Sequence, residues 1–314
     1  MNTTIAVVVF MFLGQGAAPC EQAREDAPTI TLMPHWQKGE TRRYTMVKEC
    51  RKTQGATVVN GRATTPIRIE VLDAHEGGYL IGWTAGQTRV DDSNQAADLL
   101  TKVVTDLAGD VTVVLHLDSR TKLQGVRNWR QLQAMARETV DATVEQAKKA
   151  GTDDVTAEKT RRQLLSMFAT KQQVEMLFTR SSQVFFMPLG LEHSAGRPRE
   201  YEDRLPNPFG GEPFPTRASF TVDRIDPSSD TAVITWRQEI DPVAGARVLE
   251  ETMKDMAARM GKPIPAGQIL DFVNVRDEAR FTLHLSSGWP RHLSHTRTTI
   301  IAGVSQVDSL TFTE

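Results

Sequence analysis

Cysteine, charge of one sign and long hydrophobic runs are all scarce in this chain. Its 314 residues include two cysteines, too few for a disulfide scaffold or a cysteine-based zinc site. The 37 Lys and Arg residues nearly balance the 39 Asp and Glu residues, giving a formal net charge of −2. No overall field therefore attracts nucleic acid or an anionic membrane, and we expect no nucleic-acid partner. Hydrophobic residues make up 39% of the chain, so a buried core is expected and wholesale disorder is excluded.

Recognisable catalytic motifs are missing as well. The sequence holds no G-x-G-x-x-G, G-x-x-x-x-G-K-[ST], H-E-x-x-H or G-x-S-x-G, which excludes the familiar dinucleotide, P-loop, zincin and nucleophile-elbow signatures. The run from Ser119 to Lys122 matches S-x-x-K, but neither S-D-N nor K-T-G follows to complete a β-lactamase-like site. The pattern therefore nominates no catalytic, cofactor-binding or metal-ligating residue. It favours a protein that is not an enzyme and has no cofactor.

The one sustained apolar run, Ile5 to Leu13, is too short to cross a membrane as a helix. Small residues follow it between Gly14 and Ala18, as they do before a signal-peptidase site. We therefore predict a signal peptide over residues 1–18 and no transmembrane span in the mature chain. The protein is expected to be exported, to the periplasm or to the extracellular space.

Cys20 leaves three outcomes open. It stands where a bacterial lipoprotein carries its acylated cysteine, but Pro19 directly before it is a poor fit, so a lipid anchor is the less favoured outcome. If cleavage falls after Gly16 or Ala18, Cys20 can form a disulfide with Cys50 in an oxidising compartment. Otherwise Cys20 is removed or its thiol stays idle.

Several sequence blocks recur in the same order along the chain. The motif G-x-x-R-x-Y occurs at Gly39 and again at Gly196. Residues 67–83 resemble residues 220–236, with aliphatic residues, an aspartate and a tryptophan in matching places. Repeats in a conserved order indicate a duplicated unit. We therefore predict an α+β fold of two pseudo-repeated strand-helix-strand halves, with curved antiparallel sheets and a central helical insert.

The predicted boundaries follow from this pattern. Residues 28–126 form the first β-rich half, residues 127–187 the helical insert and residues 188–314 the second β-rich half, all in one compact unit. Period-two alternation predicts antiparallel hairpins, with turns at Gly77-Gly78 and at Asp226–Asp230. Further strands are expected over four segments: 111–117, 273–285, 291–301 and 304–313.

Helices are predicted from apolar residues at spacings of three and four. Asp241 is a good N-cap for a helix that ends before Gly261, and its counterpart runs from Ser93 to Ala108. The insert is expected to hold two helices, 129–147 and 155–182, packed as a hairpin. The proline-rich residues from Leu205 to Pro215 are predicted to form a loop.

Histidine and tryptophan supply the candidate site residues. His116 and His284 each lie in an L-H-L triplet, and could meet across a pseudo-twofold as a metal or proton-linked site. The simpler interpretation is that they point outward between inward leucines. His292 and His295 are three apart on a strand, so they lie on opposite faces and cannot chelate together.

Other candidates have equally plain interpretations. Trp83 and Trp236 either line a ligand site or fill the core, and the core is favoured. The same holds for the methionine stripe of the Asp241 helix (Met253, Met256 and Met260). The acidic residues Asp91, Asp92, Asp153 and Asp154 lack the spacing of a calcium loop, so helix caps and turns explain them.

The stretch from Trp36 to Tyr44, with its Lys38-Gly39-Glu40 turn and a later Gly82-Trp83 strand, resembles exported bacterial proteins of unknown function. The layout is also similar to that of periplasmic lipoprotein carriers, which hold acyl chains in a half-open barrel. This resemblance carries over no site residues, and the ligand-binding residues stay unknown. It implies a binding or envelope role more than catalysis. Binding of a lipid or other hydrophobic or amphiphilic ligand is our leading hypothesis. A cell-envelope scaffold that engages another envelope protein is the second hypothesis, and a hydrolase of unrecognised type is the third.

Overall fold

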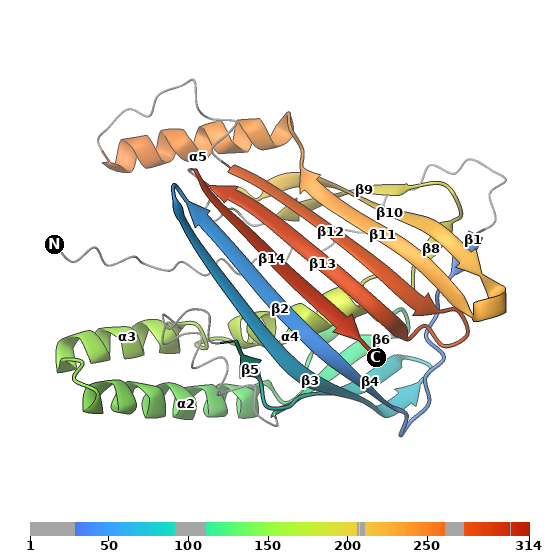
Figure 1. Cartoon of the computed structure of the whole chain (residues 1–314), viewed down its shortest axis with the longest axis horizontal. Coiled ribbons are helices and arrows are strands. Elements are labelled where there is room, and N and C mark those ends of the chain that lie inside the picture. Colours follow the sequence, from blue (N-terminus) through green and yellow to red (C-terminus); the bar gives the residue numbers. More distant parts are fainter. Residues whose placement is uncertain (1–28, 92–110, 206, 208–210, 261–272, 302) are drawn as a thin grey trace. The chain divides into compact units, whose positions relative to one another are not determined.

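The protein is described here by a computed structural model that covers residues 29–91, 111–205, 207, 211–260, 273–301 and 303–314 (Figure 1). The predicted signal peptide, Cys20, Asp92, the expected helix from Ser93 to Ala108 and Gly261 lie outside these residues.

The described residues contain far more strand than helix. The strands are β1 (Thr29–Thr31), β2 (Thr41–Gln54), β3 (Thr57–His75), β4 (Gly78–Ala85), β5 (Arg89–Val90), β6 (Val111–Asp118), β7 (Leu123–Val126), β8 (Glu192–Ser194), β9 (Arg199–Leu205), β10 (Phe214–Asp226), β11 (Thr231–Ile240), β12 (Val273–His284), β13 (Pro290–Ile301) and β14 (Val304–Thr313). The helices are α2 (Trp129–Lys149), α3 (Asp154–Ser166), α4 (Lys171–Phe186) and α5 (Ala244–Met260), with a short 3₁₀ turn η1 (Pro227–Ser229).

The predicted fold class is wrong. The strands pair in the order β7-β6-β4-β3-β2-β14-β13-β12-β11-β10-β9, with β5 beside β3, and form one 12-stranded antiparallel sheet in place of two repeated halves. Strands of the predicted first half pair with strands of the predicted second half: β1 pairs with β8, and β2 pairs with β14. A chain cut into two separate strand-helix-strand halves cannot make these pairs.

The chain divides into two compact units. Among the described residues, unit 1 comprises Trp36–Met46 and Ala63–Met187, and unit 2 comprises the residues up to His35, Val47–Arg62 and Pro188–Glu314. The long β2–β3 hairpin therefore contributes its base to unit 1 and its tip to unit 2.

Two hairpins explain why a repeat was inferred. Both the β3–β4 pair and the β10–β11 pair contain a β-bulge, after Val71 and after Val222. However, Val71 lies opposite Ile81 and Val222 lies opposite Ile234, so Ile69 and not Ile67 takes the place of Phe220. The gapless alignment was out of register because η1 makes the second turn longer than the turn at Gly77.

In unit 1 the segment between β7 and β8 forms three helices, where two were predicted. Asp153 caps α3, because its side chain accepts a hydrogen bond from the backbone N–H of Thr156. Thr170 begins α4 with a capping box that it shares with Gln173. This second cap ends the single long helix that was expected over 155–182.

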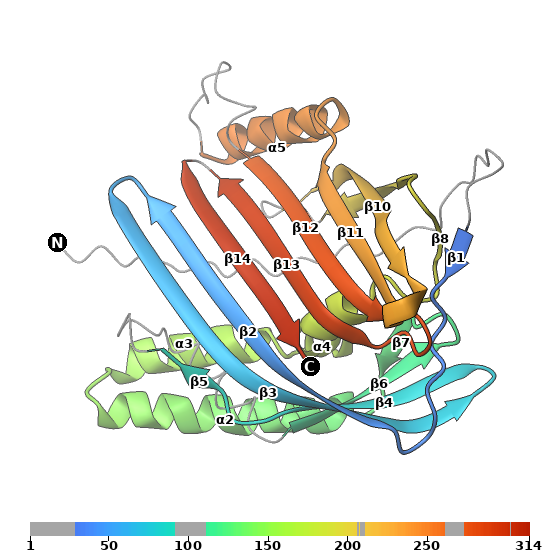
Figure 2. The same ribbon diagram turned by 45° about the vertical axis from the view of Figure 1, so that its right-hand side comes forward.

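Several expected elements of unit 2 are confirmed. Asp241 caps the turn before α5 by accepting hydrogen bonds from the N–H groups of Val243 and Ala244. Figure 2 shows α5 at the end of the sheet where β11 ends and β12 begins. Its Val248 and Leu249 pack with Leu205, Phe214 and Val273 in a small apolar core. The strands expected over 273–285, 291–301 and 304–313 are present as β12, β13 and β14, and in unit 1 the strand expected over 111–117 is present as β6.

Candidate functional site

Trp83 and Trp236 are both core residues, as the favoured interpretation held. Their exposed fractions are 5% and 4%. Trp83 belongs to an aromatic cluster of unit 1, in which its ring centroid lies 5.3 Å from that of Phe185 and 6.1 Å from that of Phe186. The cluster also contains Trp36, Tyr44 and Tyr79.

Trp236 lies in a more polar environment in unit 2. Its indole N–H donates a 2.8 Å hydrogen bond to the Tyr201 hydroxyl, and its ring centroid is 6.2 Å from that of His295. Burial raises the pKa of Tyr201 to about 12, so this hydroxyl stays protonated. The Phe220 ring also lies beside the Trp236 ring, and it is stacked with the ring of Tyr201.

A buried ion pair lies next to Trp236. The Asp277 side chain is fully buried, and it accepts two hydrogen bonds of 2.8 Å from Arg297 and one of 2.9 Å from His295. Burial by itself would raise the pKa of Asp277, but the His295 hydrogen bond and the Arg297 charge outweigh burial, so the pKa is lowered. These residues satisfy one another, which makes the cluster a structural network and not an open binding site.

The sequence contained an unused signal for this network. Along β12 the inward positions are Val273, Val275, Asp277, Ala279, Phe281 and Leu283. Asp277 therefore falls in a series of apolar residues, where an unpaired charge is too costly to bury. The same alternation places His295 and Arg297 on the inward face of β13, so a cross-strand ion pair could have been predicted.

His116 and His284 belong to different units. His284 lies at the end of β12 in unit 2 and contacts Asp230 at 3.2 Å, Glu314 at 3.6 Å and Arg291. His116 lies on β6 in unit 1, opposite Leu80. His292 is exposed beside Thr313 and His295 lies on the other face of β13, as their spacing predicted.

No group of three or more His, Cys, Asp or Glu side chains among the described residues could hold a metal ion. Asp153 acts as a helix cap, and the pKa of its carboxyl is lowered by the Thr156 backbone hydrogen bond. The predicted S-x-x-K residues lie in the turn between β6 and β7, where the Asp118 side chain accepts hydrogen bonds from the N–H groups of Arg120 and Lys122. Burial and the neighbouring Asp308 raise the pKa of Cys50 to about 12, so its thiol is unreactive.

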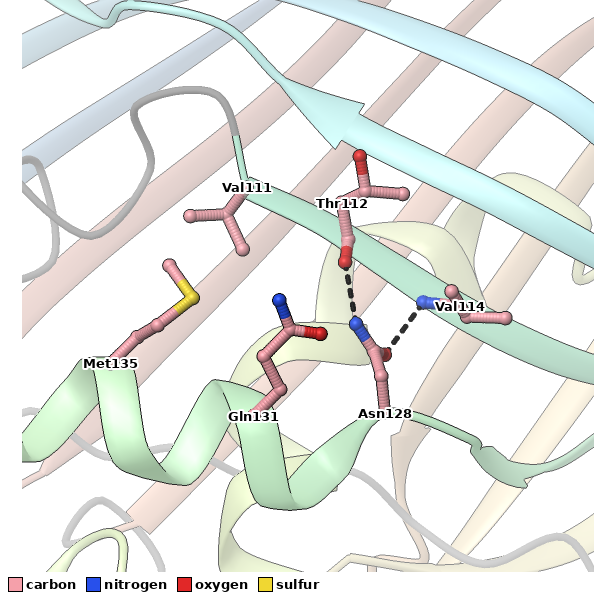
Figure 3. A pocket seen from close by; sticks show the side chains of 6 residues that line it. All are labelled: Val111, Thr112, Val114, Asn128, Gln131 and Met135. Carbon is pink, nitrogen blue, oxygen red and sulfur yellow. Dashed lines mark hydrogen bonds between the residues drawn. The ribbon is translucent and has the colours of Figure 1, made fainter.

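Unit 1 contains a pocket of about 380 Å³ between the edge of β6 and the start of α2 (Figure 3). This volume lies near the lower end of the range for small-molecule sites, roughly 300–1,000 Å³. Val111, Thr112 and Val114 of β6 line one side, and Asn128, Gln131 and Met135 line the other. The lining therefore combines aliphatic side chains with two carboxamides and carries no ionisable group among the described residues.

Asn128 fixes the wall of the pocket. Its carboxamide donates a 2.8 Å hydrogen bond to the Thr112 carbonyl and accepts one of 2.9 Å from the Val114 N–H (Figure 3). The Thr112 hydroxyl is paired with that of Thr84 at 2.8 Å. Gln131 has no hydrogen bond to another described residue. Its carboxamide lies beside Met135 and faces β6, so it is available to a ligand.

Little in the sequence indicates this pocket. Its residues come from the outer edge of a strand and from the first turns of a helix, and they share no spacing. Gln131 and Met135 do lie one helical turn apart, so they were bound to share a face. Which strand edge they would meet depends on the pairing of β6, which local sequence does not determine.

Comparisons with known proteins assign no family. No family model matches the chain, and no curated protein matches it. Among solved structures, the chain is similar to one titled "Lipid-protein interactions in lipovitellin", with 9% sequence identity and a TM-score of 0.43. The alignment covers 88% of this chain and 25% of the lipovitellin chain, so this chain spans about a quarter of that protein's length. The resemblance to exported proteins and lipoprotein carriers stays a prediction.

None of the helices in the described part of the chain is long and apolar enough to cross a membrane.

Proposed function

We propose that the protein binds a small amphiphilic molecule in the pocket between β6 and α2. The observation that carries this proposal is the mixed lining: Val111, Val114 and Met135 offer apolar contact, and the Gln131 carboxamide has no hydrogen bond to another described residue. An amphiphile has an apolar part and a polar part, and this lining offers surface of both kinds. The volume of about 380 Å³ suits a short chain better than a long one.

The exposed surface gives less support to a scaffold that engages another protein. Such a protein would carry a broad apolar patch. Among the described residues, the exposed large aliphatic side chains are valines from several separate elements: Val58, Val59, Val90, Val155 and Val243. Single exposed apolar residues of this kind are normal on a protein surface.

We also propose that this binding takes place outside the cytoplasm. The proposal rests on the apolar run from Ile5 to Leu13 and the small residues that follow it. Expression of the full chain in bacteria followed by fractionation and N-terminal sequencing tests it. A mature chain that begins near residue 19 in the periplasm or medium supports export, and an uncut chain in the cytoplasm contradicts it.

Ligand binding is tested with a dansyl-labelled medium-chain fatty amide, whose fluorescence rises on transfer to an apolar site. We expect saturable enhancement with the wild-type protein and its loss in Met135→Trp, because the larger ring fills the pocket. Arg137→Trp is the matched control, since it adds the same ring at an exposed position of the same helix. Native mass spectrometry after organic extraction identifies any lipid that co-purifies. Equal enhancement in both variants, or none in the wild type, would refute the proposal.

A further inference from the structure

The polar part of the pocket is uncharged. The six described residues that line it include no Asp, Glu, Lys, Arg or His. An ionised group placed against this lining would gain no counter-ion from these six residues, so it would have little to offset any loss of water. A carboxylate or an ammonium group is therefore a poor match for this part of the pocket.

The hydrogen bonds already formed in the lining limit which ligand head groups the pocket can bind. Both functional ends of the Asn128 carboxamide are already engaged by the β6 backbone, and the Thr112 hydroxyl is engaged by Thr84. Of the three polar side chains in the described lining, only that of Gln131 has no hydrogen bond to another described residue. Its carboxamide carries one acceptor oxygen and a donor NH₂ group. A partner that both donates and accepts satisfies both of them, whereas a carboxylate accepts only and an ammonium donates only.

We infer that the pocket selects amphiphiles whose polar end is uncharged and both donates and accepts hydrogen bonds, as a primary amide or an alcohol does. Gln131 is the residue that hydrogen-bonds this polar end. The inference rests on the proposed ligand-binding function. Val111, Val114 and Met135 contact the apolar chain, and Gln131 sets the preference for the head group. Gln131 is exposed on α2, so its replacement leaves the core of the helix intact.

The test measures displacement of the dansyl amide by four probes with the same chain: octanamide, octanol, octanoate and octylammonium, near pH 7. One net hydrogen bond corresponds to a difference of about fivefold in affinity. We expect octanamide and octanol to bind at least about fivefold more tightly than either charged probe. In Gln131→Leu this preference should fall to less than about twofold, and the dansyl amide should bind more weakly but still measurably, because its apolar contacts with Val111, Val114 and Met135 remain.

A second variant should reverse the head-group preference and favour a charged probe. Gln131→Glu places a carboxylate at the same position, so octylammonium should become the preferred probe and octanoate the weakest. Circular dichroism melting of both variants verifies that they fold. Equal binding of octanoate and octanamide by the wild type, or an unchanged preference in Gln131→Leu, overturns the inference but leaves ligand binding standing. Failure of the dansyl probe itself to bind overturns the proposed function, and the head-group inference with it.

Discussion

The two buried tryptophans lie in similar bulged hairpins but in different chemical environments. Trp83 packs edge-on against Phe185 in a cluster of aromatic rings in unit 1. Trp236 donates its indole N–H to Tyr201 and lies beside His295, which in turn bonds the buried Asp277. Similar local sequence therefore supports an apolar core in one unit and a polar network in the other.

The two environments differ in how strictly each one determines the packing of its unit. Aromatic pairs prefer offset or edge-to-face geometry, but several arrangements satisfy them about equally well. A buried carboxylate is less tolerant, because it costs several kcal/mol unless its partners are all in place. We therefore expect the Asp277 and Arg297 contact to hold the register of β12 against β13, and the aromatic cluster of unit 1 to depend on shape and apolar burial. Three variants test this contrast.

The largest effect is expected for Asp277→Ala. It leaves the Arg297 guanidinium buried without its carboxylate, which costs about 3–5 kcal/mol. Urea unfolding measures the change in free energy. Glu278→Ala is the matched control on the same strand, because the Glu278 side chain is 44% exposed and its ion pairs contribute about 0–1 kcal/mol. Equal losses in the two variants would show that burial of the Asp277 pair is energetically unimportant.

The Asp277 effect should also depend on pH. The pKa of Asp277 is lowered in the folded protein, so its contribution is fully present above the unfolded pKa of about 3.9. It is lost as the pH falls through the lower, folded value. The difference in unfolding free energy between wild type and Asp277→Ala should therefore shrink below about pH 4. A difference that stays constant in acid would contradict the lowered pKa.

A smaller loss is expected for Phe185→Leu. The substitution keeps an apolar side chain but removes edge-to-face contacts with Tyr44, Trp83 and Phe186. Each aromatic pair contributes about 0.5–1.5 kcal/mol beyond its buried area, so a total loss of about 2 kcal/mol is expected. No carboxylate is involved, and the loss should be the same across the pH range in which the Asp277 effect changes. If the loss of unfolding free energy caused by Phe185→Leu also shrank in acid, the two cores would not differ in their pH dependence.

The smallest effect is expected for Tyr201→Phe, which removes the acceptor for the Trp236 indole N–H. A buried donor left without a partner costs about 1–3 kcal/mol, and we expect a value near the lower end because the ring itself is retained. A double-mutant cycle with Trp236→Phe isolates the hydrogen bond. Additive losses in the cycle would mean that the two residues do not interact energetically.

Local signals in the sequence predicted elements better than their assembly. The turn at Asp226–Asp230, the Asp241 cap and the alternating strands were all recognised, because each depends on neighbouring residues. The order of the sheet was not, since the pairing of β2 with β14 joins residues far apart in sequence. Helices were expected within residues 129–182, where α2, α3 and α4 lie, but the Thr170 capping box that separates α4 from α3 was overlooked.

The candidate site was harder to foresee than the fold. Asp277, His295 and Arg297 could have been singled out as charges on inward strand positions. The residues of the pocket could not, because valine, threonine, asparagine, glutamine and methionine are ordinary at strand edges and helix starts. Their role depends on β6 and α2 meeting, and that contact is a property of the folded unit.

The contact between Asn128 and β6 covers part of a strand edge. A strand edge with unpaired backbone groups can recruit strands from other molecules, and proteins commonly cover such edges. The Asn128 carboxamide occupies the Thr112 carbonyl and the Val114 N–H as a neighbouring strand would. A foreign strand that added at this point would first have to displace the side chain of Asn128, the same residue that shapes the pocket.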